Sequence, residues 1–246
     1  LDAAQGRGII TLLSRLHAAH PTVEIESCAS GGGRIDYGIL QQTSRVWLSD
    51  CIDALERLRM QQVAALVIPS SITGSHVGAH HAHTTGRELP MAFRAWVAAM
   101  RHMGFESDLR QFSDDEIEIL SRVTQWYKDN RAWMMAGDIH QLDSDDPTVT
   151  AEIQISNSGD RFVVFAGQNA STQQILPRTL RFTGLDPEAI YAIKLKTPED
   201  KAPHSRGPAA VKTSSLTLSG QTLMSKGVNL PIAWPATMWV IEGTKV

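Results

Sequence analysis

The stretch Glu26-Ser-Cys-Ala-Ser-Gly-Gly-Gly-Arg-Ile-Asp36 is the part of the chain that decides the fold. It overlaps the end of a short strand predicted over residues 22–28 and places three consecutive glycines directly after it. In barrels of parallel strands, functional groups gather on the loops that follow the carboxyl ends of the strands. Because glycine has no Cβ, such a loop lets backbone N–H groups approach a ligand closely. A plain tight turn explains a bare glycine run as well, so both interpretations stay open here.

The segments on both sides of this stretch alternate between helical and strand patterns. Helices are predicted over 1–19, near 37–42 and over 53–62, strands over 45–49 and 63–69, and a polar loop over 70–90, while 91–103 holds either a strand or a helix. The run VAALVIP (63–69) is continuously apolar, as buried parallel strands are. Repeated strand–loop–helix units predict a parallel sheet with crossover helices, here about half of an eight-stranded barrel. A doubly wound sheet is the alternative, but the glycines do not match G-x-G-x-x-G.

In the second half of the chain, a long helix is followed mainly by short strand patterns. Ser113 and Glu116 form a capping-box pattern that opens a long helix, with Gly137 as its expected end. Candidate strands follow over 149–155, 162–165, 176–182, 189–195, 215–218 and 237–241, separated by turn signals. The predicted fold class is therefore α/β followed by all-β. We expect a partial (β/α)8 barrel in residues 1–142 and an antiparallel β-sandwich in residues 143–246.

Composition narrows the function classes. The chain has 246 residues, a net charge of −3 and a pI of about 6.3, which gives no reason to expect nucleic acid or an anionic membrane as partner. No stretch approaches the roughly 18 apolar residues of a membrane span. Two cysteines do not suggest a disulfide framework, so we expect a cytoplasmic protein. The chain starts with Leu1 inside a helical pattern, which leads us to expect a fragment.

A second stretch, Val46-Trp-Leu-Ser-Asp-Cys-Ile-Asp53, carries the candidate acid. Asp50 follows a predicted strand and Asp53 comes three residues later. Either could be a general acid, because an aromatic such as Trp47 beside a carboxyl partly desolvates it and raises its pKa. The competing interpretation is that Asp50 is the N-cap of the next helix. Asp53 is expected one turn into that helix. In the glycine loop, Arg34 and Asp36 are expected to form a bidentate ion pair.

Other reactive side chains give weaker signals. The histidines 76, 80, 81 and 83 cluster, but in a loop-like segment without helical spacing or nearby Cys or Asp, so no metal site is predicted. Ser30, Ser49 and Cys28 are possible nucleophiles without a G-x-S-x-G elbow. The tryptophans 96, 126, 133, 234 and 239 sit in periodic apolar segments and are expected in the core; Trp47 is the exception.

Together, the two stretches and their spacing resemble glycoside hydrolase family 36, the bacterial and fungal α-galactosidases. Further similarity is seen in PSSITGSH (69–76), HTTGR (83–87), MGFESDL (103–109) and LMSKGVNL (223–230). The resemblance implies a (β/α)8 barrel with a large β domain before it and a β-sandwich after it. This chain would supply about strands five to eight and the C-terminal sandwich.

The resemblance also implies roles for particular residues. Asp50 corresponds to the acid/base, and Cys28, Ser30 and Gly31 to residues that line the galactose subsite, with Trp47 close by. The family commonly has Asn after the acid/base, whereas this chain has Cys51. The family's nucleophile lies in a Lys-x-Asp-x-Asn motif at the end of strand four, which does not occur in this chain and is expected upstream of Leu1.

The function implied is that of a retaining α-galactosidase acting on α-galactosides such as melibiose or raffinose, without a cofactor. The chain alone is expected to be inactive because it lacks the nucleophile. Family members are often tetramers, so a homo-oligomer is expected for the intact protein. A raffinose-type galactosyl transferase and a non-catalytic sugar-binding module remain alternatives, and a metal-dependent hydrolase using the histidines is a more distant one.

Overall fold

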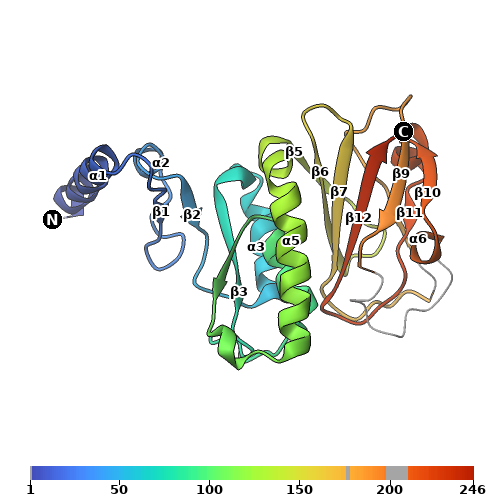
Figure 1. Cartoon of the computed structure of the whole chain (residues 1–246), viewed down its shortest axis with the longest axis horizontal. Coiled ribbons are helices and arrows are strands. Elements are labelled where there is room, and N and C mark those ends of the chain that lie inside the picture. Colours follow the sequence, from blue (N-terminus) through green and yellow to red (C-terminus); the bar gives the residue numbers. More distant parts are fainter. Residues whose placement is uncertain (1, 176–177, 198–209) are drawn as a thin grey trace.

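The computed structural model describes residues 2–175, 178–197 and 210–246. The chain forms a parallel sheet and an antiparallel sheet with helices packed between them (Figure 1). This layered arrangement explains why the helix α4, Met91–Ala99, is buried along its whole length. It packs against the strand β3 on one side and the strand β12 on the other.

The parallel sheet contains four strands in the order β1-β2-β3-β4. Its elements are α1 (Asp2–Ala19), β1 (Glu26–Ser27), α2 (Tyr37–Leu40), β2 (Arg45–Trp47), α3 (Ala54–Ala64), β3 (Thr73–Gly78), α4, β4 (His102–Glu106) and α5 (Asp114–Ala136), with 3-10 turns at Ser70–Ile72 and Leu109–Gln111. Each strand pairs with the next one along the chain, as in successive units of a β/α barrel. The predicted helices at 1–19, 37–42 and 53–62 and the strand at 45–49 are confirmed.

The strand predicted over 63–69 is wrong. Helix α3 continues to Ala64, the chain then turns, and Leu66 and Val67 are 69% and 82% exposed. The strand lies instead at Thr73–Gly78, in the segment predicted as a polar loop. Its sequence TGSHVG is poor in apolar residues because its glycines make room for neighbours: a Cβ on Gly74 would lie 2.7 Å from Glu26 Oε2, and one on Gly78 would lie 2.5 Å from Ile52 Cδ1.

The long helix begins and ends as predicted. Ser113 Oγ accepts a hydrogen bond from the Glu116 amide, and the Glu116 carboxylate accepts one from the Ser113 amide. Gly137 is the C-cap. The ambiguous segment 91–103 holds both α4 and the first residues of β4.

The antiparallel sheet has six strands in the order β10-β9-β12-β7-β6-β5. Its strands are β5 (Asp138–Leu142), β6 (Val149–Ile155), β7 (Arg161–Gln168), β9 (Ile190–Leu195), β10 (Leu216–Ser219) and β12 (Thr237–Lys245). A third, two-stranded sheet is formed by β8 (Thr179–Leu180) and β11 (Val228–Asn229), near the short helices α6 (Ala210–Thr213) and α7 (Gly220–Ser225). Part of the strand predicted over 176–182 lies outside the described residues. The sheet starts at Asp138, within the region predicted as barrel, and the division after residue 142 stays a prediction.

The six-stranded sheet has an apolar core on each face. One core includes Trp239 and Phe162, and the other joins Phe165 to Trp96 and Trp126 of the helices. A buried ion pair also joins the segment between α4 and β4 to strand β6, since Arg101 donates to both carboxylate oxygens of Glu152 at 2.6 and 2.8 Å. One tryptophan expected in the core is not there: Trp234 is 55% exposed.

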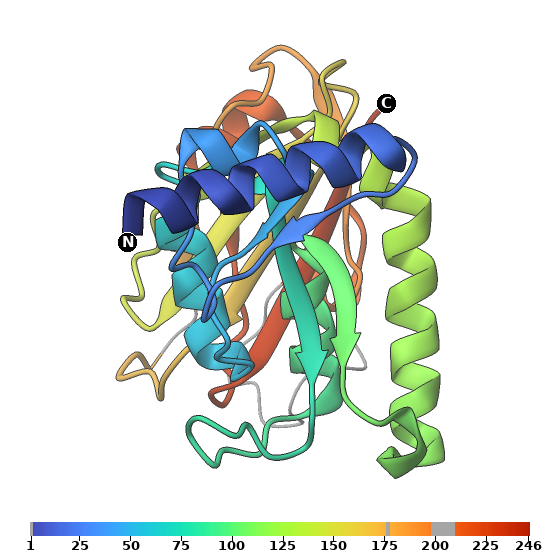
Figure 2. The same cartoon turned by 90° about the vertical axis from the view of Figure 1, so that its left-hand side faces the viewer.

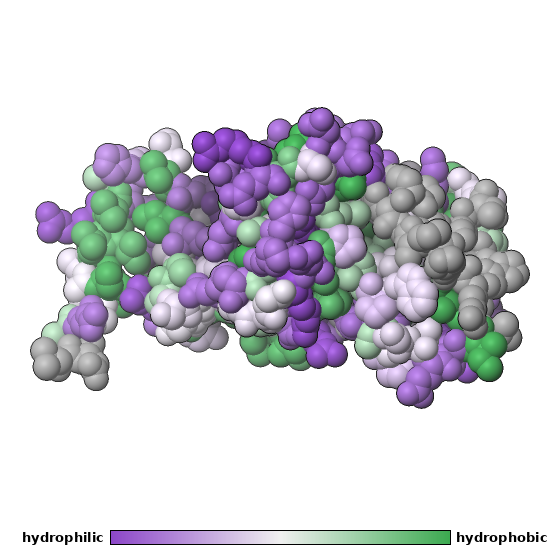
Figure 3. All heavy atoms as spheres, turned by 90° about the horizontal axis from the view of Figure 1, so that it is seen from below, coloured by the Kyte–Doolittle hydropathy of each residue, from purple (hydrophilic) through white to green (hydrophobic). Residues whose placement is uncertain are grey.

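The N-terminal end of the molecule exposes apolar side chains. Helix α1 lies at the N-terminal end of the molecule (Figure 1) and crosses in front of the parallel strands in the view of Figure 2, and its Leu12 and Leu16 are 50% and 42% exposed. Apolar side chains gather at this end in the view from below (Figure 3). Within the described ranges, no helix is both long and apolar enough to cross a membrane.

Candidate active site

The carboxyl ends of the parallel strands bring the two sequence stretches together. Cys28 follows β1 and Asp50 lies in the loop after β2, and both side chains are exposed. The Cys28 thiol lies 3.8 Å from Asp50 Oδ1. Among the described residues, it is the one group within hydrogen-bonding range of that carboxylate, so the Asp50 side chain faces solvent at the mouth of the sheet.

The glycine run is a tight turn that also supports Asp50. Ser30 and Gly31 have φ angles of +50° and +70°. A Cβ on Gly31 would lie 2.6 Å from Ser49 Cα and 2.9 Å from the Asp50 amide nitrogen. Only glycine therefore lets the backbones of the two loops pack directly against each other.

The predicted ion pair between Arg34 and Asp36 is wrong. Asp36 is the N-cap of α2, and its Oδ1 accepts a hydrogen bond of 2.9 Å from the Ile39 amide. Capping satisfies an amide that would otherwise lack a partner at the helix start. Arg34 contributes to the loop through its carbonyl, which accepts a hydrogen bond from Ser27 Oγ at 3.2 Å.

The helix N-cap after β2 is Asp53, not Asp50. Asp53 Oδ1 accepts hydrogen bonds from the amides of Leu55 and Glu56 at 2.9 and 3.4 Å. Asp53 therefore precedes α3 instead of lying one turn into it, and it is 1% exposed. The capping interpretation of Asp50 is thus excluded, which leaves its exposed carboxyl available for chemistry.

Trp47 lies beneath the mouth and is only 4% exposed. Its ring stacks on the His76 ring with centroids 4.0 Å apart, and the Arg57 guanidinium lies 4.1 Å from its centroid. The expected desolvation of Asp50 by Trp47 is not seen, because Asp50 is exposed whereas Trp47 is buried.

Arg57 is a supporting residue that the sequence analysis missed. It is 1% exposed and donates hydrogen bonds to the carbonyls of Ser49 at 2.9 Å and Gly74 at 2.7 Å. Burial lowers the pKa of Arg57 to about 10, so the side chain stays charged at neutral pH. Its position on the same helical stripe as Ala54 and Leu58 was the available signal, since a charge on a buried stripe needs specific partners.

One face of the parallel sheet is polar. The strand register places Glu26, Arg45, Trp47, Gly74, His76, Gly104 and Glu106 on the same face. His76 Nδ1 lies 3.4 Å from Glu106 Oε2. Carboxylates, imidazoles and backbone groups are hydrogen-bonding partners for hydroxyls, so this face together with the mouth suits a ligand rich in hydroxyl groups.

The predicted histidine cluster is dispersed in space. His80 contacts Glu116 at 3.3 Å, and His81 contacts Glu88 at 3.1 Å, while His76 lies in the sheet. In the part of the chain that the structure describes, no three His, Cys, Asp or Glu side chains are grouped as metal ligands would be.

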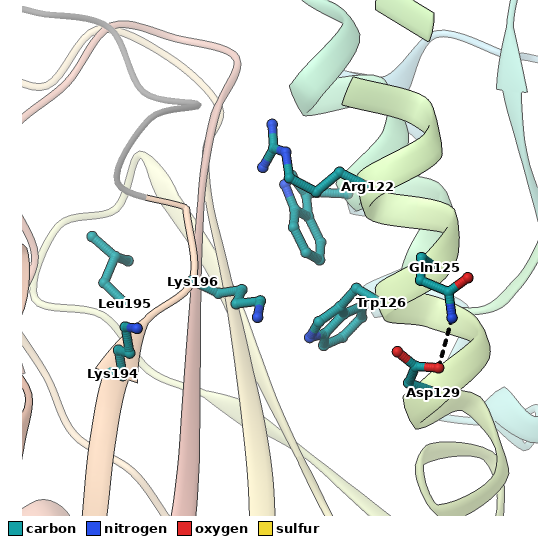
Figure 4. A pocket seen from close by; sticks show the side chains of 8 residues that line it. Arg122, Gln125, Trp126, Asp129, Lys194, Leu195 and Lys196 are labelled. Carbon is teal, nitrogen blue, oxygen red and sulfur yellow. Dashed lines mark hydrogen bonds between the residues drawn. The ribbon is translucent and has the colours of Figure 1, made fainter. Parts of the chain in front are cut away.

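A separate cavity lies between α5 and β9 (Figure 4). Its volume is about 480 Å³, and it is lined by Trp96, Arg122, Gln125, Trp126, Asp129, Lys194, Leu195 and Lys196. None of the residues predicted for the site from the sequence lines this cavity. It belongs to the junction between the helices and the antiparallel sheet.

The exposed carboxyl and the glycine loop lie at the carboxyl ends of successive parallel strands, which is the end where β/α barrels have their active sites. Comparison with known proteins agrees with this class. A family model described as Melibiase matches residues 3–137, and one described as Glycosyl hydrolase family 36 C-terminal domain matches residues 149–241. The chain belongs to the glycoside hydrolase family 36 α-galactosidases, the melibiase family.

Its relatives share both sequence and fold. An α-galactosidase of Escherichia coli is 33% identical over 244 residues, which are 97% of this chain and 34% of that protein. A probable α-galactosidase C of Aspergillus terreus is 33% identical over 226 residues, 91% of this chain and 28% of that protein. The crystal structure of the family 36 α-galactosidase AgaB from Geobacillus stearothermophilus superposes with a TM-score of 0.84 at 27% identity, over 97% of this chain and 31% of that one.

The chain therefore spans about a third of the length of the relatives it matches. These likenesses confirm the predicted fold class, a partial (β/α)8 barrel followed by an antiparallel β domain.

Proposed function

We propose that this chain supplies the acid/base side of the active site of a retaining α-galactosidase, with Asp50 as the acid/base. The observation that carries the proposal is the exposed Asp50 carboxyl at the end of β2, on a loop held in place by Gly31 and Arg57. The relatives named as α-galactosidases support the substrate class.

In the proposed mechanism, a carboxylate outside these 246 residues attacks the anomeric carbon while Asp50 protonates the departing glycosidic oxygen. Asp50 then removes a proton from water, which attacks the galactosyl intermediate and releases galactose with retained configuration. The two carboxyl groups of retaining glycosidases lie about 5–5.5 Å apart. Cys28, Ser30 and Gly31 would line the galactose subsite, and Trp47 would support it from below.

The proposed substrates are terminal α-galactosides such as melibiose and raffinose. The chemistry needs no cofactor, because two carboxyl groups and water supply every proton and electron pair. A cytoplasmic location and a homo-oligomeric state, a tetramer in the family, are parts of the same proposal. The two cysteines are unpaired, which is typical of a reducing compartment.

The test uses the protein expressed from the complete reading frame that contains this sequence. We expect hydrolysis of raffinose with α-galactose as the first product in an NMR time course, and a loss of about 10²–10⁴-fold in Asp50→Asn. An Asp50→Asn protein as active as the wild type would refute the assignment. Transfer of the galactosyl group from raffinose to a second raffinose molecule, giving a tetrasaccharide and sucrose in place of free galactose, would identify a transferase instead.

The 246-residue chain by itself is expected to be inactive. The Lys-x-Asp-x-Asn motif that carries the family's nucleophile does not occur in it. Hydrolysis of an aryl α-galactoside by the purified chain would contradict a nucleophile outside these residues. If the chain is inactive, the coding DNA upstream of the codon for Leu1 is the place to look for that motif.

A further inference from the structure

The loop between β3 and α4 (residues 79–90, the β3–α4 loop) reaches the loop that carries Asp50 (residues 48–53, the acid loop). Thr84 Oγ1 lies 3.1 Å from Cys51 Sγ, next to Asp50 in the chain. Thr85 Oγ1 donates a hydrogen bond of 2.6 Å to Asp53 Oδ2, and Arg87 Nη1 donates one of 3.0 Å to the same oxygen. Three nearby side chains of one loop thus fasten both ends of the segment 51–53.

Asp53 is the centre of this attachment. Its two oxygens accept four hydrogen bonds, two from amides of α3 and two from the β3–α4 loop. Because Asp53 is 1% exposed, water cannot readily replace a lost donor. Arg87 also donates to Glu56 at 2.8 Å, and that hydrogen bond together with the charge of Asp53 raises the pKa of Arg87.

The β3–α4 loop has a defined shape of its own. Gly86 adopts a φ of +69° and its amide donates to the Ala82 carbonyl at 2.7 Å. The Ala82 amide in turn donates to the Arg87 carbonyl at 3.0 Å, and Ala82 is 5% exposed. This closed turn presents Thr84, Thr85 and Arg87 together to the acid loop.

Among the residues that the structure describes, the Asp50 carboxyl has one side-chain contact within hydrogen-bonding range, the Cys28 thiol at 3.8 Å. Its position is therefore set by the backbone of the acid loop. Gly31 supports this backbone from the β1 side, and Arg57 holds the Ser49 carbonyl. The β3–α4 loop supplies the remaining attachment.

We infer that Thr84, Thr85 and Arg87 are positioning residues that hold Asp50 where it can protonate the leaving oxygen. This inference rests on the proposed function. A displaced acid impairs substrates whose leaving group must be protonated, but barely affects those whose leaving group departs as a stable anion. The ratio of the two activities therefore reports the position of Asp50 separately from the amount of folded protein.

The experiment compares kcat/KM, which reports the first glycosyl transfer, for raffinose and for an α-galactoside of an acidic phenol. The variants Thr84→Val, Thr85→Val and Arg87→Gln are made in the protein from the complete reading frame. Each should lose about 10–100-fold on raffinose, the effect of a displacement of up to about 1 Å, and less than about threefold on the aryl substrate. Arg87→Lys keeps the charge and should recover part of the loss.

Glu88→Gln is the matched control, since Glu88 lies on the same loop but pairs with His81. It should leave both activities unchanged. The inference would be overturned if the three variants lost kcat/KM equally on the two substrates, or if none of them lost any. In either case, turnover of raffinose by the wild type would still support the proposed function. Among the hydrogen bonds of the described residues, Thr84→Val removes the one with Cys51, so its result tests the inference even if Arg87→Gln unfolds the protein. An inactive wild type, or an Asp50→Asn variant without selective loss on raffinose, refutes the proposed function instead.

Discussion

Replacing Gly31 by alanine tests whether the glycine run positions Asp50 or merely turns the chain. The new Cβ would lie 2.6 Å from Ser49 Cα, whereas ordinary contacts begin at about 3.4 Å. The obstacle is backbone, which cannot rotate away as a side chain can. The acid loop must therefore shift by roughly 0.8 Å, the difference between these two distances.

Two effects set the expected magnitude. The φ of +70° at Gly31 costs a residue with a Cβ about 1–2 kcal/mol, and the overpacking adds about 1–3 kcal/mol. A misplacement of about 1 Å at a catalytic group costs about 10²-fold in rate. We therefore expect Gly31→Ala to lose about 2–5 kcal/mol of unfolding free energy and about 100-fold in kcat/KM for raffinose.

Gly33→Ala is the matched control. A Cβ there would lie 2.5 Å from the Ala29 carbonyl oxygen, within the glycine loop itself, and meets no atom of the acid loop. We expect a destabilisation of similar size from the overpacking, about 1–3 kcal/mol, but a much smaller loss of activity. Urea unfolding and raffinose kinetics on both variants separate the two effects. Equal losses of activity in the two variants, or a loss below about fivefold in Gly31→Ala, would refute the reasoning.

Three further predictions concern stability, each measured by urea unfolding. Hydrogen bonds from two neighbouring serines lower the pKa of Asp160 from 3.8 to about 2. The ionised carboxylate therefore contributes fully to the unfolding free energy above pH 3.8, and this contribution is lost as the pH falls towards 2. The difference in unfolding free energy between wild type and Asp160→Asn should decrease over the same pH range, and a difference that persists at pH 2 would contradict the prediction. Glu152→Ala should cost about 3–5 kcal/mol by leaving Arg101 buried and unpaired, and Glu152→Leu combined with Arg101→Met should restore most of it. Arg57→Met should cost at least about 2 kcal/mol, because the carbonyl of Gly74 loses a buried hydrogen bond and that of Ser49 a partly buried one. An unchanged unfolding free energy would show that water replaces the guanidinium.

Sequence patterns correctly predicted those structural features that are formed by residues close together in the chain. The capping box at Ser113 and Glu116 is a reciprocal contact within one helical turn, so the pattern alone identifies it. The strand β3 could not be recognised in this way. Its side chains alternate between the polar face of the sheet and the face covered by helices. Its glycines are needed because Glu26 and Ile52, which are distant in sequence, occupy the space that a Cβ would fill. The apolar run at 63–69 led to a wrong strand prediction because apolar residues were taken to be buried, whereas Leu66 and Val67 are exposed in the described structure.

In the site, too, contacts with residues distant in sequence could not be predicted. Asp50 and Asp53 are separated by only two residues, and both precede the helix α3. Nothing in their spacing says which is the cap and which is the acid. The structure separates them by the number of hydrogen bonds each accepts. Asp53 is buried, and its two oxygens accept four hydrogen bonds, two from amides of α3 and two from the β3–α4 loop. A change at this carboxyl would therefore weaken the contacts between the acid loop and the β3–α4 loop. Asp50 is exposed, and within the described ranges its one side-chain partner is the Cys28 thiol at 3.8 Å, so a change at this carboxyl removes few contacts of the fold. Substituting each in turn should therefore give opposite profiles: Asp53→Asn should mainly lower the unfolding free energy, and Asp50→Asn should mainly lower turnover.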